Sequence, residues 1–221
     1  MHYATAERRE HLNHGLSHDP FKAIVAPRPI GWIATVSAGG VLNLAPYSFF
    51  NAVSEAPPMV MFASAGRKDS LTNIEATGEF TCSVASQALV DHMNLSSAAV
   101  ASDIDEFAMA GLPTAPSLVV APPRVATSPA ALECRLWKTV ELPGERPATV
   151  VFGQVVAIYV DERMVKNGVL DTAAMRPLAR MGYMDYAVVT AETTFTLNRP
   201  VVDDDRRSAR VTPGPWDGVY R

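Results

Sequence analysis

The chain has 221 residues, 48% of them hydrophobic and 19% charged, which is typical of a folded globular protein rather than a disordered one. The formal net charge is −4 and the Lys and Arg residues are scattered, so the sequence disfavours a nucleic-acid-binding protein. No run reaches the roughly 18 apolar residues of a membrane helix, and the first residues lack the apolar region of a secretion signal. Cys82 and Cys134 lie in strand-like runs without a C-x-x-C motif, so we expect buried thiols in a soluble cytoplasmic protein.

The first part of the chain predicts, in order, a peripheral helix at 4–14, strands at 28–36, 41–45 and 58–64, a helix at 69–77 and a strand at 79–86. Gly39 and Gly40 predict a tight turn between the first two strands, because glycine adopts positive φ readily. The helix at 69–77 has Asp69 or Ser70 as its expected N-cap and Gly78 as its end.

The second part predicts, in order, helices at 86–98 and 103–110, strands at 132–142 and 148–160, a helix within 162–176, and a last strand or arm at 194–200. Apolar and polar residues alternate along 132–142, as in a half-buried antiparallel strand. Gly153 indicates a bulge or a close backbone approach in its strand. The proline-rich segment 111–131 predicts an ordered loop that lies over a ligand or reaches another subunit.

Several of these strands are joined by turns that are too short for parallel crossovers. We therefore expect a mainly β protein, a closed or nearly closed antiparallel barrel with short helices on its outside. Residues 1–221 read as one domain, with a peripheral N-terminal segment (1–19) and a C-terminal tail (200–221). Neither G-x-G-x-x-G nor G-x-x-x-x-G-K-[ST] occurs, so a bound nucleotide would need another kind of site.

Two neighbouring stretches carry the chemistry. The start of the helix at 69–77 combines unpaired backbone N–H groups with Arg67, Lys68 and Ser70, which suits a phosphate monoester. An ordinary capped helix on a solvated loop is the alternative. Just upstream, "NLAPYSFFNAVS" mixes polar and aromatic side chains that could face a planar heterocycle, although the phenylalanines alone would be ordinary core residues.

The wording and order of "RPIGWIATVSAGGVLNLAPYSFFNAVSEAPPMVMFASAGRKDSLTNIEATGEF" closely resemble the flavin reductase-like family of FMN-binding split-barrel proteins, in its flavoredoxin-type branch. The resemblance covers about residues 20–190 and is densest from Pro27 to Phe80. It implies a six-stranded Greek-key split barrel and a homodimer with one FMN per subunit near the dimer interface.

The resemblance also implies which residues contact the cofactor. The family's flavin-contact loop matches Tyr47, Ser48, Phe49, Phe50 and Asn51, and its phosphate-binding run matches Arg67, Lys68, Asp69 and Ser70. The strand residues beside these motifs match Thr35 and Ser64. The family's late glycine-tyrosine segment matches Gly182 and Tyr183. Three departures stand out. Ser70 replaces a common Thr, Ser83 replaces a common Asn, and no histidine follows His92, so the histidine that some members place near the nicotinamide is missing.

The expected function is an NAD(P)H-dependent flavin reductase that transfers hydride from NADH or NADPH to flavin N5 and passes reduced flavin to an acceptor, such as a partner oxygenase. Because the cofactor carries the electronics, this reaction needs stacked rings more than an acid or base, and no catalytic side chain is assigned. Two alternatives stay open: an FMN-bound electron-transfer protein, and an FMN-dependent enzyme that acts directly on a small organic substrate.

The N-terminal histidines and the charged run near the C-terminus indicate no functional site. His11, His14 and His18 have helical spacing that could gather three imidazoles around a metal, yet Gly15 interrupts the helix and no further ligand is evident, so no metal site is expected. The run "DDDRR" at 203–207 predicts a mixed-charge surface turn.

Overall fold

The computed structural model describes residues 1–5, 9–145, 147–216 and 218. Its helices are α1 (Glu10–Asn13), α2 (Phe21–Ile24), α3 (Asp69–Thr77), α4 (Val90–Leu95), α5 (Glu106–Met109) and α6 (Thr172–Met175), with 3-10 turns η1 (Gln87–Leu89), η2 (Glu162–Met164) and η3 (Ala191–Thr193). The principal strands are β2 (Gly31–Val36), β3 (Leu42–Tyr47), β4 (Phe50–Glu55), β5 (Pro58–Ala65), β6 (Glu79–Val84), β9 (Ala130–Leu142) and β10 (Ala148–Val160). The short strands are β1 (Arg28–Pro29), β7 (Thr114–Ala115), β8 (Arg124–Val125), β11 (Val165–Lys166), β12 (Val169–Leu170), β13 (Leu178–Arg180), β14 (Tyr186–Val188), β15 (Val201–Val202) and β16 (Ala209–Arg210).

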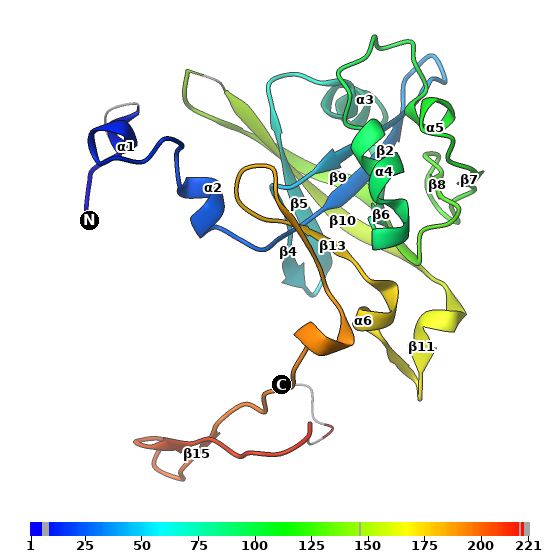
Figure 1. Ribbon diagram of the computed structural model, residues 1–221. Helices are drawn as coiled ribbons and strands as arrows, with labels where there is room; N and C mark the ends of the chain where they lie inside the picture. The colour runs from blue at the N-terminus through cyan, green and yellow to red at the C-terminus, as the bar shows by residue number, and fades with distance from the viewer. Residues whose placement is uncertain (6–8, 146, 217, 219–221) are drawn as a thin grey trace.

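The seven principal strands form one antiparallel sheet in the order β3-β2-β6-β9-β10-β5-β4 (Figure 1). The mainly β architecture is confirmed, but the sheet has one strand more than the six expected. The additional strand is β4, part of which was expected to be a loop. Phe50 pairs there with Phe62 of β5, so the backbone after the aromatic pair is extended rather than looped.

The sheet curls strongly. Tyr47 of β3 and Phe62 of β5 have ring centroids 4.6 Å apart, although four other strands separate β3 from β5 in the hydrogen-bonded order. The apolar cluster inside this curl also contains Ile33, Phe80 and Val151. A flat sheet could not bring these side chains together, so the sheet encloses a barrel-like core.

A second core cluster lies on the other side of β2. Trp32 and Leu44 pack there with Met93 of α4 and Phe107 of α5, and the Trp32 indole donates to Ser96 Oγ at 2.9 Å. Successive residues of β2 thus enter opposite clusters, since side chains alternate along a strand. Helices α3, α4 and α5 gather at one side of the sheet (Figure 1), where they flank β3.

The bounds of helix α3 and the turn between β2 and β3 agree with the sequence expectations. The helix α3 spans Asp69–Thr77 and ends at Gly78, which has φ 75° and donates its N–H to Ile74. Its N-cap is Lys68, however, and no side chain caps that end, so Asp69 and Ser70 were wrong as N-cap residues. The turn at Gly39 and Gly40 is confirmed, with φ 86° at Gly40.

The bulge or close backbone approach expected at Gly153 is confirmed. The register between β10 and β9 shifts between Phe152 and Gly153, and a Cβ at Gly153 would lie 2.3 Å from Cζ of Phe80. Glycine therefore makes room for the buried Phe80 ring. In the facing strand, Glu133 was expected on the polar, exposed side but is 4% exposed. The N–H groups of Leu118, Val119 and Val120 all donate to its carboxylate, which explains why a buried charge is tolerated.

Several expected elements are shorter or absent. Helix α1 covers Glu10–Asn13 of the expected 4–14, where residues 6–8 lie outside the described chain. Helix α5 begins after Asp105 rather than Asp103, because the Asp105 carboxylate accepts the N–H groups of Phe107 and Ala108. The short helix expected within 162–176 is confirmed as α6, and η2 and the hairpin β11–β12 precede it. Residues 194–200 form no strand and are largely exposed.

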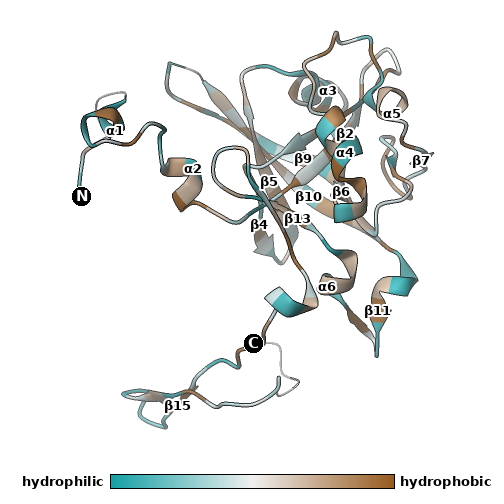
Figure 2. Cartoon of the chain, in the orientation of Figure 1, coloured by the Kyte–Doolittle hydropathy of each residue, from teal (hydrophilic) through white to brown (hydrophobic). Residues whose placement is uncertain are grey.

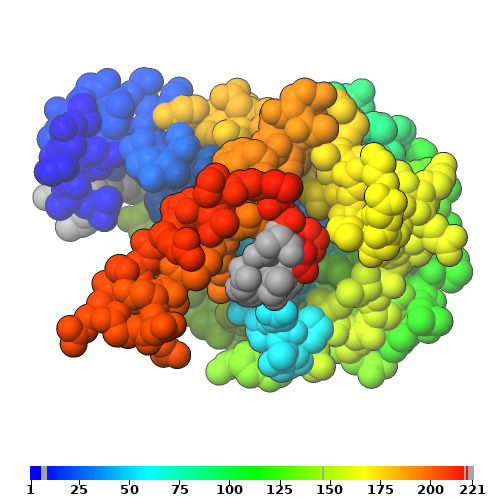
Figure 3. Space-filling view, turned by 90° about the horizontal axis from the view of Figure 1, so that it is seen from below, coloured from blue at the N-terminus to red at the C-terminus, as the bar shows by residue number. Residues whose placement is uncertain are grey.

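Both ends of the chain leave the sheet. The N-terminal segment extends to one side and the C-terminal tail runs below the body before folding back in the hairpin β15–β16 (Figures 1 and 3). Apolar side chains of this tail are exposed, with Phe195 at 79% and Leu197 at 77%, and Figure 2 shows apolar residues in its hairpin as well. Among the described residues, no helix is both long and apolar enough to span a membrane.

Candidate functional site

A cavity of about 290 Å³ lies where the start of α3 meets the edge strand β3. Three parts of the chain line it: β3 through Asn43, Ala45 and Tyr47, residues 67–70, and residues from the segment 96–106. The fold therefore brings Tyr47 together with the run Arg67, Lys68, Asp69 and Ser70, as the resemblance implies. We refer to this space as the anion cavity.

The anion cavity offers several groups to a phosphate. Helix α3 begins in it without a side-chain cap, so the helix dipole and first-turn N–H groups point into it. The Lys68 ammonium lies 5.8 Å from the Tyr47 ring centroid, over the cavity wall. Arg67 is 64% exposed and pairs with Glu75 at 2.6 Å, so its charge is already partly compensated. Lys68 and the helix end are therefore the stronger anion-binding groups.

Tyr47 contributes an unusual atom. The side chain is buried, yet its hydroxyl has no hydrogen-bond partner with acceptable geometry among the described residues. Burial raises the pKa of the phenol, and the nearby hydroxyls of Ser70 and Ser64 only partly oppose that shift. An unpaired buried hydroxyl is costly in an isolated protein, so a ligand oxygen in the cavity would satisfy it.

A buried polar network lies behind the cavity. The amide oxygen of Asn43 accepts from Ser70 Oγ at 2.8 Å and from Thr35 Oγ1 at 3.2 Å, and Asn73 Nδ2 donates to Thr35 at 3.0 Å. The Asn43 amide nitrogen donates to both carboxylate oxygens of Glu106, at 3.0 and 3.1 Å. Thr35 is fully buried in this network, one layer behind the cavity lining.

Glu106 is a cavity residue that the sequence did not reveal. Its carboxylate is buried, lines the anion cavity and also accepts the Leu44 N–H at 3.0 Å. Burial raises its pKa, hydrogen bonds from Leu44 and Asn43 oppose the shift, and Asp69 reinforces it. In the sequence, an acid at the first position of a helix is ordinary, so nothing distinguished Glu106 from a solvated helix-start residue.

Ser48 lies in a neighbouring cavity of about 140 Å³ on the other face of the edge strand. Pro46, Met93, Arg180 and Tyr186 are among its other lining residues, and Ser97 lines both cavities. The two spaces thus meet around β3 at Ser97. A ligand with a phosphate at one end and a flat ring at the other would span them.

The remaining predicted contact residues are spread around these cavities without lining them. Phe49 is 39% exposed and faces the Arg28 guanidinium at 5.8 Å, while the Phe50 ring covers Gly31 so closely that a Cβ there would meet it at 2.5 Å. The exposed Asn51 accepts from the Ala52 N–H. Ser64 is fully buried and donates to the Gly66 carbonyl at 2.9 Å.

Gly182 and Tyr183 lie further along, in the turn between β13 and β14. Gly182 packs against Ala23, where a Cβ would lie 2.7 Å from the alanine methyl. Tyr183 has φ 52°, is half exposed and lines a separate cleft of about 550 Å³ with Met184, which also lines the Ser48 cavity. Tyr183 is thus one cleft away from the predicted ring position.

The proline-rich loop 111–131 is ordered, as expected, but lies away from both cavities. The loop 111–131 packs on β6 and β9: Ala121 N–H donates to Glu79, Val125 N–H to Ser83 Oγ at 3.1 Å, and Thr81 Oγ1 to the Pro123 carbonyl. None of its described residues lines the anion or Ser48 cavity. Ser83 is fully buried and holds this loop through its hydroxyl.

The histidines and the acidic tail hairpin lie apart from both cavities. The His14 ring stacks on Tyr3 and pairs with Glu10 at 3.5 Å, whereas His18 lies against Tyr183. Within the described residues, no three His, Cys, Asp or Glu side chains are grouped to hold a metal.

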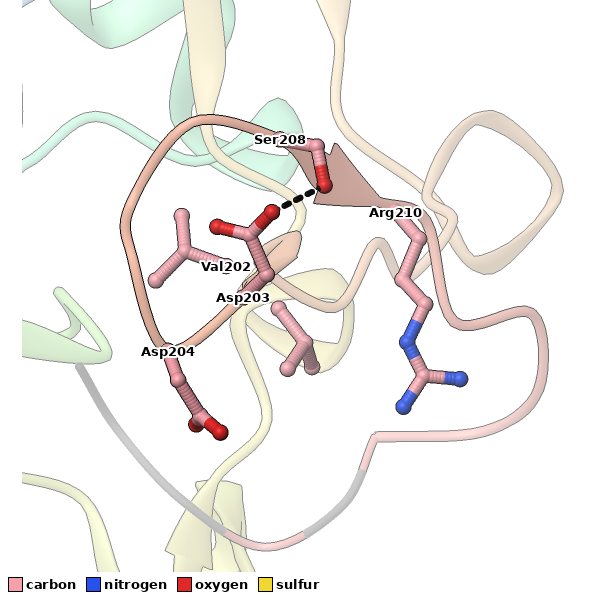
Figure 4. Close-up of a pocket in the computed structure, with 6 residues that line it drawn as sticks. Val202, Asp203, Asp204, Ser208 and Arg210 are labelled. Atoms are coloured by element: carbon pink, nitrogen blue, oxygen red, sulfur yellow. Dashed lines mark hydrogen bonds between the residues drawn. The ribbon is translucent and has the colours of Figure 1, made fainter.

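The run at 203–207 is the predicted surface turn. Ser208 donates to Asp203 there, beside a shallow hollow of about 340 Å³ made mostly by the hairpin β15–β16 itself (Figure 4). The hollow lies in the tail and has no connection to the anion cavity in its lining residues.

Comparison with known proteins identifies the framework. The family described as the flavin reductase like domain matches residues 25–182, more than half of the chain. The chain belongs to this family. An uncharacterized protein of Deinococcus radiodurans is 40% identical over 80% of this chain and 82% of its own length. The residues that line the anion cavity therefore lie within the matched region, as do most of those that line the Ser48 cavity, whereas Tyr183, Met184 and Tyr186 follow its last residue.

Solved structures agree with this assignment. Nitrilotriacetate monooxygenase component B from Bacillus cereus is 26% identical, with a TM-score of 0.81 over 89% of this chain and 98% of that chain. A 2-nitrobenzoate 2-nitroreductase from Pseudomonas fluorescens is also 26% identical, with a TM-score of 0.78 over 92% and 100%. A Shewanella frigidimarina protein with a split barrel domain is 22% identical, with a TM-score of 0.74 over 90% and 98%, and shows the same fold.

Proposed function

We propose that the protein is an FMN-dependent oxidoreductase, specifically a flavin reductase that takes its electrons from NADH or NADPH. The observation that carries the proposal is the anion cavity, which joins an uncapped helix start and Lys68 to the unpaired, buried hydroxyl of Tyr47. These groups fit a phosphate ester, and the family membership supports FMN as its bearer. When bound, FMN would supply a ring that accepts hydride at N5.

In this proposal, the phosphate lies at the start of α3. Lys68 supplies charge, the helix start supplies N–H groups and Tyr47 supplies a hydroxyl donor. Ser70 can also turn toward the ligand at low cost, because Thr35 still donates to the Asn43 oxygen that Ser70 would leave. Asp69 and Glu106 bring negative charge nearby, so the site selects by hydrogen-bond geometry as well as by charge.

The flat ring belongs in the neighbouring Ser48 cavity. Pro46 and Met93 give it apolar walls, while Ser48 gives it a hydroxyl. Phe49 and Phe50 support this loop from its other side, held by Arg28 and by the close fit over Gly31. The protein's own contribution to hydride transfer is thus to fix the ring and exclude water, which needs no side-chain acid or base.

A visible spectrum of the purified protein, recorded before and after anaerobic addition of NADH, tests the proposal. Flavin absorption bands that bleach would support a bound flavin reduced by nicotinamide. Bands that persist would contradict the nicotinamide donor. Protein that stays colourless after FMN is added would overturn the flavin assignment itself.

A second candidate function is direct reduction of an organic substrate by the bound flavin. It is favoured by the likeness to the 2-nitrobenzoate 2-nitroreductase and by the open cleft at Tyr183, which adjoins the Ser48 cavity at Met184. Steady-state turnover with a nitroaromatic acid, compared with turnover of free FMN, separates this activity from flavin reduction.

We also propose a homodimer that passes reduced flavin to a partner oxygenase. The structural likeness to nitrilotriacetate monooxygenase component B supports the oxygenase partner. On the long β9–β10 pair, Trp137 is 63% exposed and in ring contact with Phe152, which supports an interface there, because apolar surface of this kind is usually covered. The free, buried Cys82 and Cys134 fit a reducing compartment such as the cytoplasm.

A further inference from the structure

The cleft at the Tyr183 turn is built from two segments that are far apart in the sequence. His18, Phe21 and Lys22 come from the chain around α2, and Tyr183 and Met184 come from the turn between β13 and β14. Its volume of about 550 Å³ is within the range of small-molecule sites. We refer to it as the α2 cleft.

The walls of the α2 cleft are held together by a buried arginine. Arg28 is 6% exposed and donates to the carbonyls of Lys22 and Val25 on one side and of Met181 on the other. Gly182 packs directly on Ala23 between the same two segments. The spacing of the walls is therefore fixed by packing and hydrogen bonds rather than left to two mobile surface segments.

The tip of the turn is also constrained. Tyr183 adopts φ 52°, a left-handed conformation that few residues other than glycine take. Arg180 donates to the Tyr183 carbonyl and stacks on Tyr186 at 4.6 Å, which holds the turn in place. Strain of this kind is retained where the surrounding structure enforces it, and here it presents the Tyr183 ring to His18 at 5.5 Å.

The cleft surface is apolar and aromatic but remains open. Phe21 is 55% exposed, Tyr183 48% and Met184 78%, although all three converge on one concave space. Large apolar side chains gathered around a cleft are typical of a binding site for a flat apolar group. The rings of His18, Phe21 and Tyr183 suit a planar aromatic ligand.

The polar groups of the cleft indicate the charge of that ligand. No ion pair is found for Lys22 among the described residues, whereas Asp19 already accepts the Phe21 N–H at 2.9 Å. A lysine at the rim of an aromatic cleft suits a carboxylate or similar anion. Met184 also lines the cavity that contains Ser48 and Arg180, so the two spaces adjoin at this side chain.

We propose that the α2 cleft binds a single-ring aromatic anion, with its ring among His18, Phe21 and Tyr183 and its anionic group on Lys22. The inference rests on the proposed function in one respect: if FMN binds as proposed, the aromatic anion would lie next to the flavin ring. Binding itself is a property of the cleft and can be measured with or without flavin.

The test is calorimetric titration of the full-length protein with benzoate and with benzamide, which has the same shape and no charge. We expect benzoate to bind about tenfold more tightly, the preference that one charge-assisted contact gives. Lys22→Gln should abolish the preference while leaving FMN affinity unchanged. The matched control Lys166→Gln, on the exposed hairpin β11–β12, should keep it.

A second variant tests the aromatic wall. Tyr183→Ala should weaken both benzoate and benzamide, because it removes ring contacts rather than charge. Equal binding of the two ligands to the wild type, or a charge preference that survives in Lys22→Gln, would overturn the proposal.

The titration also separates this inference from the proposed function. Benzoate binding by protein that takes up no FMN would keep the cleft assignment and reject the flavin assignment. FMN binding without any benzoate preference would do the reverse.

Discussion

At the scale of single residues, the anion cavity combines groups whose roles can be separated by small substitutions. Lys68 supplies charge, Tyr47 supplies an unpaired hydroxyl, and Glu106 fixes the orientation of Asn43 behind them. Each substitution below changes one of these properties and keeps the approximate shape of the side chain.

Lys68→Gln removes the charge that faces the phosphate. We expect FMN affinity to fall about tenfold, since one charge-assisted hydrogen bond is lost. Affinity for riboflavin, which lacks the phosphate, should stay unchanged. Fluorescence titration of both flavins measures the difference, and Lys138→Gln on the exposed side of β9 is the control. An equal loss for FMN and riboflavin would place Lys68 at the ring instead.

Tyr47→Phe removes a buried hydroxyl for which the described residues offer no well-aligned hydrogen-bond partner. The free energy of unfolding of the apoprotein should stay the same or rise by up to about 1 kcal/mol, because the variant no longer buries an unpaired polar group. FMN affinity should fall. Urea denaturation and flavin titration check the two effects. Tyr186→Phe is the contrast, because its hydroxyl accepts from Arg180. A clear destabilisation by Tyr47→Phe would mean that Ser64 or Ser70 already satisfies the hydroxyl.

Glu106→Gln tests the buried carboxylate through pH. Burial raises its pKa in the folded protein above the ordinary 4.5, so the folded state holds more protons than the unfolded state between these two values. The stability that neutral Glu106 contributes is present below 4.5 and is lost as pH rises through the folded pKa. The variant should therefore be most destabilised, relative to wild type, at acid pH, by about 1–3 kcal/mol.

Urea denaturation of both proteins across this pH range measures that difference. Glu162→Gln, in the exposed turn η2, serves as the control and should leave the pH profile unchanged. A difference that grows with rising pH would show that the carboxylate is stabilised in its charged form instead.

At the scale of elements, the sequence predicted strands and helices well where local chemistry decides them. Helix α3 was placed at its observed bounds because Gly78 ends it, and Gly153 was identified as a close approach because a strand interior rarely contains glycine. Strand β4 was not predicted, since its extended form depends on pairing with β5. Of the two alternatives for 194–200, a strand or an arm, the strand was wrong, because none of the described strands pairs with the β-forming residues there.

The same reasoning explains which parts of the site were found. Tyr47, Ser48 and residues 67–70 line the two cavities, and they could be named in advance because they are close in sequence and carry distinctive chemistry. Phe49, Phe50 and Asn51 were named with them but line neither cavity. Glu106 enters the cavity only because α5 packs against β3, a contact between distant segments that no local pattern records. Thr35 was expected to face the cofactor, and in the structure it lies behind the cavity lining, bonded to Asn43 and Asn73.

Gly153→Ala tests the close approach at the bulge. The new Cβ would lie 2.3 Å from Phe80 Cζ in a packed core, so the variant should lose about 1–3 kcal/mol of unfolding free energy. Phe80→Leu in the same protein should recover part of that loss, because it removes the clashing ring atoms. Gly39→Ala is the matched control, since its nearest neighbour is 3.8 Å away. Urea denaturation of the four proteins measures these effects, and a tolerated Gly153→Ala would mean that the bulge can open.

At the scale of the whole molecule, the curled sheet leaves apolar surface on its outside. Trp137 is 63% exposed beside Phe152, with ring centroids 6.1 Å apart, on the long strand pair β9–β10. The tail beyond residue 193 adds further exposed apolar side chains. Both features are expected of a chain that pairs with a second copy.

Trp137→Asp should therefore shift the protein from dimer to monomer, because it places a charge in the proposed interface. Sedimentation analysis at several concentrations measures the change. Val165→Asp, at an exposed position on the hairpin β11–β12, should leave the dimer intact. A wild-type protein that sediments as a monomer at all concentrations would contradict the proposed dimer.

The hydrogen bonds from Arg28 to the two walls of the α2 cleft have a consequence for how the ligand preference of such a protein could change. The flavin reductase like domain matches residues 25–182, whereas His18, Phe21 and Lys22 precede it and Tyr183 and Met184 follow it, so both walls of the α2 cleft lie outside the matched region. Arg28 holds the α2 side of the cleft by donating to the backbone carbonyls of Lys22 and Val25, and every residue type has such a carbonyl. The residues that line this cleft can therefore differ between relatives, and substitutions among them could change ligand choice while the cofactor framework stays the same.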